Sequence, residues 1–155
     1  MKHVLAVCRR IRARKIGVLK QVDTYFNAKS GRVKLREING KGFELIYYKR
    51  ADRQGSRYSD YVIVPLKEPK TMKSLCTALF GVETVVEKRR TLFLYKNARI
   101  HLDNVRTLGL FVEFEVLVNR GKRQAKQLMQ FLVSEFGFDS GSSIAGSYVD
   151  LLLKR

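Results

Sequence analysis

The stretch VEKRRTLFLYKNARIHLDNV, residues 86–105, alternates charged and apolar side chains along two runs that a short polar link joins. Alternation with period two, among many β-branched and aromatic residues, predicts strands, and the short link predicts that they are antiparallel. FVEFEV, residues 111–116, repeats the pattern with acidic side chains. The charged residues at these alternate positions are Lys88, Arg90, Arg99, His101, Asp103, Glu113 and Glu115.

The same period extends over most of the chain and predicts about seven strands. The predicted strands are QVDTYF (21–26), RVKLREI (32–38), FELIYYK (43–49), YSDYVIVPL (58–66), VETVVEKRRTLFLY (82–95), ARIHLDNV (98–105) and LFVEFEVLV (110–118). Apolar residues spaced by three and four predict amphipathic helices at 72–80 and 125–136, and a third helix is expected within 1–16. We therefore expect an α+β fold with an antiparallel sheet.

The charged faces allow two architectures. In an open sheet with helices on one side, the charged face lies in water, and periodicity alone favours this arrangement. In a closed barrel, the apolar side chains lie outside under the helices and the charged ones line the lumen. A charged lumen requires an ionic ligand or water, because burying unpaired charge is costly.

Composition limits the class of protein and of partner. The chain has 155 residues, 45% of them hydrophobic, which suits one domain over 1–155. Its formal net charge of +17 predicts a polyanionic partner: nucleic acid, nucleotide, polyphosphate or an acidic membrane surface. Two cysteines and two histidines lie too far apart for a zinc-ligand spacing or a disulfide framework. No apolar run suits a signal peptide or a membrane span, so we expect a cytoplasmic protein.

Basic side chains share faces on several predicted strands. Arg32, Lys34 and Arg36 alternate in RVKLRE, and the strands at 82–95 and 98–105 repeat the arrangement. If these faces converge, they form a polyphosphate clamp, since guanidinium groups bind phosphate oxygens bidentately and lysine adds a point charge. Taken singly, each basic pair is also what a solvated strand face presents.

Glu113 and Glu115 lie two residues apart on one strand, and Asp103 is a third acid nearby in the pattern. Such carboxylates are costly to leave unpaired inside a protein, whereas Mg²⁺ accepts them as oxygen ligands. Salt bridges to neighbouring arginines and lysines explain them equally well. A metal beside cations would suit a nucleotide or polyphosphate ligand.

Longer motifs resemble a known family. They are GVLKQVDTYF (17–26), GRVKLREI (31–38), FELIYYKRAD (43–52), KRRTLFLYKNARIHLDNVRTLGLFVEFEV (88–116) and SIAGSYVDLL (143–152). Together they resemble the CYTH superfamily, which contains class IV adenylyl cyclases, thiamine triphosphatases and inorganic triphosphatases. The resemblance implies a triphosphate tunnel, an antiparallel, closed or nearly closed β-barrel of about eight strands with helices packed outside.

The resemblance also implies a site. The phosphate-binding residues would be Lys34, Arg36, Arg50, Lys88, Arg90 and Arg99, and the ligands of Mg²⁺ or Mn²⁺ would be Asp103, Glu113 and Glu115. The expected partner is ATP, tripolyphosphate or another triphosphate, and the family activity is metal-dependent cyclisation of ATP or hydrolysis of a triphosphate. The alternatives are a non-catalytic nucleotide or polyphosphate binder and an RNA-binding basic barrel, of which RNA binding ranks last because no RNP-like motif is present.

The sequence departs from the family at one motif. The family opens with a strand bearing Glu-x-Glu-x-Lys, whereas no Asp or Glu precedes Asp23 here. Residues 1–20 carry seven basic residues instead, and 1–16 resembles the helix that follows the motif strand in the family. An N-terminally truncated chain and a degenerate family member would both look like this. Either would leave a gap in the barrel and remove acidic ligands, so we expect impaired turnover.

Overall fold

The computed structural model describes residues 1–50, 58–119, 121–139, 143–144 and 146–154, without the side chain of Arg50. In chain order the elements are α1 (Lys2–Arg10), β1 (Arg14–Phe26), β2 (Arg32–Ile38), β3 (Gly42–Arg50), β4 (Ser59–Pro65), α2 (Pro69–Phe80), β5 (Val82–Tyr95), β6 (Ala98–Val105), β7 (Gly109–Val116), α3 (Lys122–Glu135) and α4 (Tyr148–Leu153). The seven predicted strands and the α+β class are confirmed.

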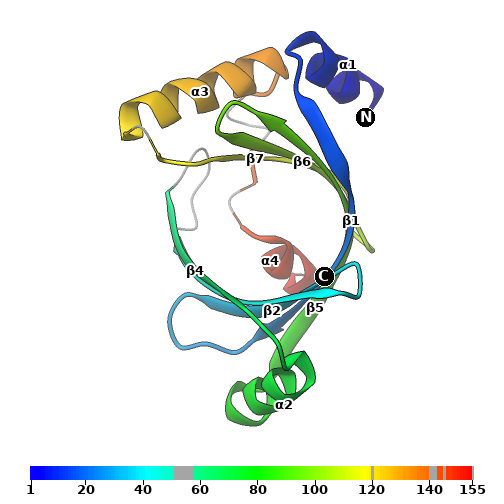
Figure 1. Cartoon of the computed structure of the whole chain (residues 1–155), viewed down its shortest axis with the longest axis vertical. Helices are drawn as coiled ribbons and strands as arrows, with labels where there is room; N and C mark the ends of the chain where they lie inside the picture. Colours follow the sequence, from blue (N-terminus) through cyan, green and yellow to red (C-terminus); the bar gives the residue numbers. More distant parts are fainter. Residues whose placement is uncertain (51–57, 120, 140–142, 145, 155) are drawn as a thin grey trace.

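All seven strands form one antiparallel sheet in the order β4-β3-β2-β1-β5-β6-β7. Figure 1 shows that this sheet curls, with α4 inside the curve and the other helices outside. Within the described residues, the edge strands β4 and β7 each pair with one neighbour and not with each other. The expected closed barrel is therefore wrong: the sheet is an open, curled half-barrel, because no described strand bridges its two edges.

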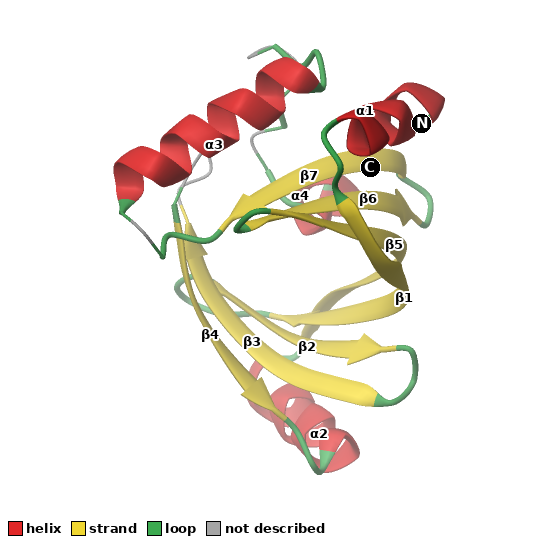
Figure 2. Cartoon of the chain, turned by 45° about the horizontal axis from the view of Figure 1, so that its top comes forward, coloured by secondary structure: helices red, strands yellow, loops and turns green. Residues whose placement is uncertain are grey.

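Figure 2 shows α1, α3 and α2 on the convex side of the sheet, and two apolar clusters lie between these helices and the strands. In the cluster under α1 and α3, Ile100 of β6 packs with Leu132 of α3, and both are fully buried. Phe114 of β7 packs against the same cluster. Under α2, Phe26 and Leu35 pack with Cys76. Apolar positions such as Leu35 and Phe114 thus lie outside, under helices, and the charged positions that alternate with them fall on the concave side.

The N-terminal helix is shorter than the predicted 1–16. α1 ends at Arg10, and the chain then turns through Arg12, whose φ is 57°. The backbone N–H of Ala13 donates to the carbonyl of Cys8 at 2.8 Å, which closes the helix. From Arg14 the chain pairs with β5 instead, so inter-strand hydrogen bonds replace helical ones. Among the described segments, no helix has the length and apolar character to cross a membrane.

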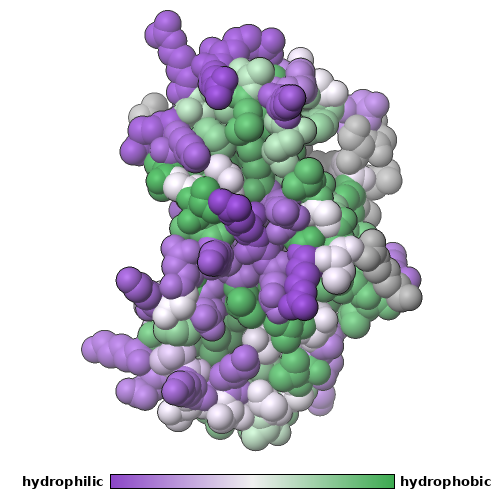
Figure 3. Space-filling model, turned by 90° about the vertical axis from the view of Figure 1, so that its right-hand side faces the viewer, coloured by the Kyte–Doolittle hydropathy of each residue, from purple (hydrophilic) through white to green (hydrophobic). Residues whose placement is uncertain are grey.

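Hydrophilic side chains occupy the middle of the convex face over β1 (Figure 3). Ile16 and Val18 of β1 are exposed there, beside exposed Lys20. The sheet is therefore covered by helices at two places and bare between them. The concave side is covered differently, since α4 packs Val149 onto Val86 and other residues of the sheet.

Candidate functional site

The concave face of β1, beyond the bulge before Gly17, is built by its odd-numbered residues. Gln21, Asp23 and Tyr25 alternate on that face, and the register places Arg36 opposite Asp23 and Lys34 opposite Tyr25 on β2. On the other side of β1, Lys88 of β5 lies opposite Gln21. Because successive side chains of a strand point to opposite faces, these pairings bring the polar residues of three strands together.

Three basic side chains converge on one carboxylate. Asp23 is fully buried, and its Oδ2 lies 2.8 Å from Nζ of Lys88 and 3.1 Å from Nζ of Lys34. Arg36 donates from Nε to Oδ1 at 2.7 Å and from a terminal nitrogen to Oδ2 at 3.0 Å. We call these four residues the basic cluster. When Lys34 is protonated, three positive charges face one negative charge, and the cluster then carries an excess of two.

The basic cluster shifts its own proton equilibria. Burial lowers the pKa of Lys34 to about 7, with the charges of Arg36 and Lys88 acting in the same direction and Asp23 opposing. Burial alone would raise the pKa of Asp23, but the surrounding cations hold it well below its usual range. The Lys34 ammonium also lies 5.2 Å from the ring centre of Tyr25 and 5.6 Å from that of Tyr48.

A second group of charges lies beside the first, around Arg90. The guanidinium donates to both oxygens of Asp103 at 2.8 and 2.6 Å and to Glu113 at 2.7 Å. Nδ1 of His101 lies 3.2 Å from the same Glu113 oxygen, and the Tyr148 hydroxyl of α4 donates to Asp103 at 3.0 Å. We call these five residues the Arg90 cluster. Burial would raise the pKa of Glu113, but the His101 hydrogen bond and the Arg90 charge lower it well below its usual range.

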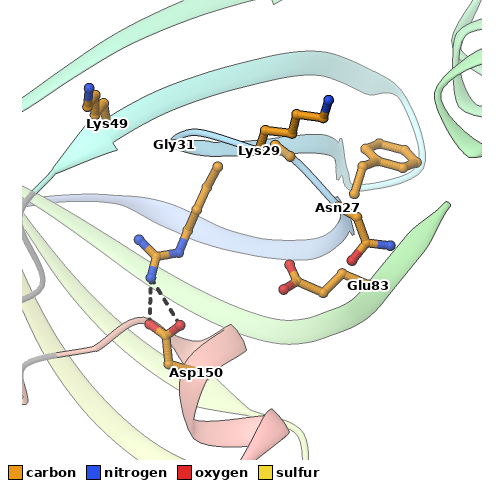
Figure 4. Close-up of a pocket in the computed structure, with 9 residues that line it drawn as sticks. Asn27, Lys29, Gly31, Lys49, Glu83 and Asp150 are labelled. Carbon is orange, nitrogen blue, oxygen red and sulfur yellow. Dashed lines mark hydrogen bonds and ion pairs between the residues drawn. The ribbon is translucent and has the colours of Figure 1, made fainter. Parts of the chain in front are cut away.

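A cavity of about 550 Å³ lies at the turn between β1 and β2 (Figure 4). Arg32 lies on the concave face of β2, two residues before Lys34. It donates there to both carboxylate oxygens of Asp150, at 3.0 and 2.9 Å. Gly31 has a φ of +70°, and a Cβ on it would lie 2.7 Å from the Tyr47 ring, so only glycine suits this turn. The cavity lining is Phe26, Asn27, Ala28, Lys29, Gly31, Arg32, Lys49, Glu83 and Asp150.

A profile of the CYTH domain matches residues 3–148. The chain belongs to the CYTH domain family. No curated protein matches the sequence of this CYTH domain. The profile match confirms the resemblance to the CYTH superfamily that the sequence motifs predict.

Solved structures share the fold of this CYTH domain. The PH1012 protein from Pyrococcus horikoshii OT3 superposes with a TM-score of 0.87 at 21% identity, over 97% of this chain and 92% of that one. A conserved hypothetical protein from Pyrococcus furiosus gives 0.79 at 17% identity, over 97% and 93%. "A putative adenylate cyclase" from Vibrio parahaemolyticus gives 0.80 at 16% identity, over 98% and 91%. At these identities the likeness shows the fold.

The predicted phosphate-binding residues of this CYTH domain divide into two groups. Lys34, Lys88 and Arg90 are 7%, 6% and 7% exposed, so a solvated strand face does not describe them. With Arg36 they meet on the concave side. Arg99 lies apart, half-exposed and paired with Glu115 at 3.1 Å. The side chain of Arg50 lies outside the described residues. Phosphate binding by these residues stays a prediction.

The predicted metal ligands are all engaged by cations. Arg90 holds Asp103 and Glu113, and Arg99 holds Glu115. In the part of the chain that the structure describes, no three His, Cys, Asp or Glu side chains are grouped as metal ligands would be. The carboxylates as arranged therefore do not fit Mg²⁺ or Mn²⁺, and the salt-bridge alternative describes their geometry. A role for either metal stays a prediction.

Sequence reasoning missed the residues that organise this CYTH site. Asp23 stood out only as the first acid of the chain, although its alternation with Gln21 and Tyr25 marks one strand face. Tyr148 and Asp150 lie in a motif, SIAGSYVDLL, that carried the family resemblance without a role for its side chains. A polar residue at every second position of QVDTYF was the available signal.

Proposed function

We propose that this CYTH domain binds the phosphate chain of a triphosphate, ATP or inorganic tripolyphosphate, on the basic cluster. The observation that carries the proposal is the convergence of three basic side chains on the single buried carboxylate of Asp23. Positive charge in excess of the single carboxylate is costly in a buried place, and the lowered pKa of Lys34 reflects that cost. An anion with several oxygen acceptors would compensate this positive charge. A solvated salt-bridge network would not require such an anion.

The chemistry of the cluster suits phosphate. One edge of the Arg36 guanidinium bonds Asp23, and the terminal N–H groups that remain can donate to phosphate oxygens. The two lysines supply point charges. Arg90 is held in a fixed orientation by Asp103 and Glu113, so it could approach the same phosphate chain without ordering cost. These residues would bind and orient the ligand and stabilise charge on its oxygens.

For catalysis, the family activity would be attack of water on the terminal phosphorus or of a ribose 3′-hydroxyl on the α-phosphorus. A metal would neutralise charge on the phosphate oxygens, but the carboxylates that would hold it are paired with arginines. We therefore propose that binding is the better-developed property of this chain and that its turnover, whether cyclase or hydrolase, is slow.

Isothermal titration calorimetry with tripolyphosphate and with ATP tests the proposal. We expect both ligands to bind, and Lys88→Ala combined with Arg90→Ala to abolish binding. The single Lys88→Met variant, which leaves the partners of Arg90 intact, should weaken binding by about tenfold to a hundredfold, since a charge-assisted hydrogen bond is lost. Lys73→Met, at an exposed lysine of α2, is the matched control and should bind as the wild type does.

Equal affinities of the Lys88→Met variant and the wild type would place the anion elsewhere on this basic protein. RNA binding stays a separate prediction: it would show an affinity for single-stranded RNA that falls steeply with salt and does not depend on Lys88.

A further inference from the structure

Gln21 lies beside the basic cluster, on the side toward Arg90. It is on the concave face of β1, two residues from Asp23 and directly opposite Lys88. The residue is 4% exposed. Among the described residues, its Oε1 is the one buried side-chain polar atom that has no hydrogen-bond partner. Buried carbonyl oxygens almost always have a donor, so this one requires an explanation.

The donors around Gln21 are directed to carboxylates. Nζ of Lys88 is 2.8 Å from Asp23, and both donating nitrogens of Arg36 bond the same carboxylate. Arg90, which lies opposite Leu19 one step along β1, donates to Asp103 and Glu113. An amide acceptor is thus placed among basic side chains that do not satisfy it. Leaving such an acceptor unsatisfied is unfavourable, because it has given up its hydrogen bond to water without gaining another donor.

A ligand that satisfies the Oε1 atom of Gln21 has to donate a hydrogen bond. Ionised phosphate oxygens only accept, so the phosphate chain on the basic cluster cannot do it. Gln21 is one same-face step, about 7 Å, from Asp23 along the strand. In a nucleoside triphosphate the group bonded directly to the α-phosphate is the sugar, whose hydroxyls are donors, whereas the base lies farther away.

We propose that Gln21 positions a nucleoside triphosphate by accepting a hydrogen bond from a ribose hydroxyl, and so selects a ribonucleotide over inorganic tripolyphosphate. The inference rests on the proposed function, because it takes the phosphate chain to lie on the basic cluster. Gln21 is a specificity residue in this assignment. Its contact is with the sugar, so its loss should affect only ligands that carry one.

The test replaces the amide by an apolar side chain of similar shape, Gln21→Met. We expect the Kd for tripolyphosphate to stay within about twofold of the wild type and the Kd for ATP to rise about tenfold, as for one lost hydrogen bond. Gln130→Met, at an exposed glutamine of α3, is the control and should leave both affinities unchanged. Melting temperatures of the variants confirm that each one is folded.

The ligand can be changed as well, which keeps the test valid whatever the variant does to folding. With the wild type, either 2′-deoxyATP or 3′-deoxyATP should bind about tenfold more weakly than ATP, and this identifies the hydroxyl. In Gln21→Met, the same deoxy analogue should show no further loss, because the partner of its missing hydroxyl is already absent.

Two failures are distinguishable. If the wild type binds both ligands and Gln21→Met weakens tripolyphosphate and ATP equally, or weakens neither, the assignment of Gln21 is overturned and the proposed function stands. If the wild type binds neither tripolyphosphate nor ATP, the proposed function is overturned and the assignment of Gln21 with it. Equal binding of ATP and both deoxy analogues to the wild type also overturns the assignment.

Discussion

Lys34 has a positive charge that depends on its surroundings. Its ammonium group is buried beside two tyrosine rings, and burial, reinforced by Arg36 and Lys88, lowers its pKa from the ordinary 10.5 to about 7. Between these two pH values the folded chain binds fewer protons at this residue than the unfolded chain. Stability from this group therefore rises with pH across that window and is lost as pH falls toward 7.

A polyphosphate beside Lys34 should raise its pKa again, so binding should take up protons at pH 8. Calorimetry in two buffers of different ionisation enthalpy measures this uptake. We expect clear uptake in the wild type and much less in Lys34→Arg, since the guanidinium stays charged at every pH of the experiment. Lys88, whose pKa burial also lowers, contributes equally to both proteins. The same uptake in both would mean that Lys34 does not meet the ligand.

At the scale of single residues, alternation predicted which side chains share a face but not which ones touch. Lys34, Arg36, Lys88 and Arg90 were identified in this way. Asp23 was not, because its partners lie up to 65 positions away and depend on the register of β1 against both neighbours. Glu113 fitted a metal and a salt bridge equally, and only its distance from Arg90 distinguishes the two.

At the scale of elements, α4 carries a hydroxyl, that of Tyr148, which bonds the fully buried Asp103. Tyr148→Phe removes this hydroxyl, and we expect it to lower the free energy of unfolding by about 1–3 kcal/mol, as for a buried hydrogen bond to a charged group. Urea denaturation measures the difference. Tyr61→Phe, at an exposed tyrosine of β4, is the control and should change stability little. A loss no larger than the control would show that Arg90 alone satisfies Asp103.

Sequence patterns located most elements and missed α4. The strands and the two longer helices have periodic runs of adequate length, whereas α4 has six residues, too few for a helical period to show. Its sequence signal is the capping box of Ser147 and Asp150, where the Ser147 N–H donates to the carboxylate at 2.6 Å. α1 was drawn too long because the turn at Arg12 comes from backbone conformation rather than from hydrophobic pattern.

At the scale of the whole molecule, closure of the sheet could not be predicted. Strand count and alternation suit both a barrel and a curled sheet. The two differ in whether β4 pairs with β7, and local sequence patterns do not predict this pairing because β4 ends some 44 residues before β7 begins. Within the described residues they do not pair. The described part of the sheet therefore keeps two strand edges, one at β4 and one at β7.

Those edges have a consequence for how copies of the protein behave together in solution. β4 is exposed along its whole length, and Val62, Ile63 and Val64 present apolar side chains beside an edge that has no partner strand in the described part of the chain. Such edges favour pairing between molecules. At low ionic strength, mutual repulsion from the net charge of +17 should keep the molecules dispersed.

Salt removes that repulsion, because the screening length falls from about 10 Å at 0.1 M to about 3 Å at 1 M. We expect dynamic light scattering to report growing particles over this range of NaCl, and Val62→Lys to suppress the growth. Val18→Lys, on the convex face of the central strand β1, is the matched control. Equal particle growth in both variants would show that another surface mediates the association. If Val62→Lys alone suppresses the growth, the basic residues outside the concave face have a second role. Their charge keeps the open edges of one molecule from pairing with those of another.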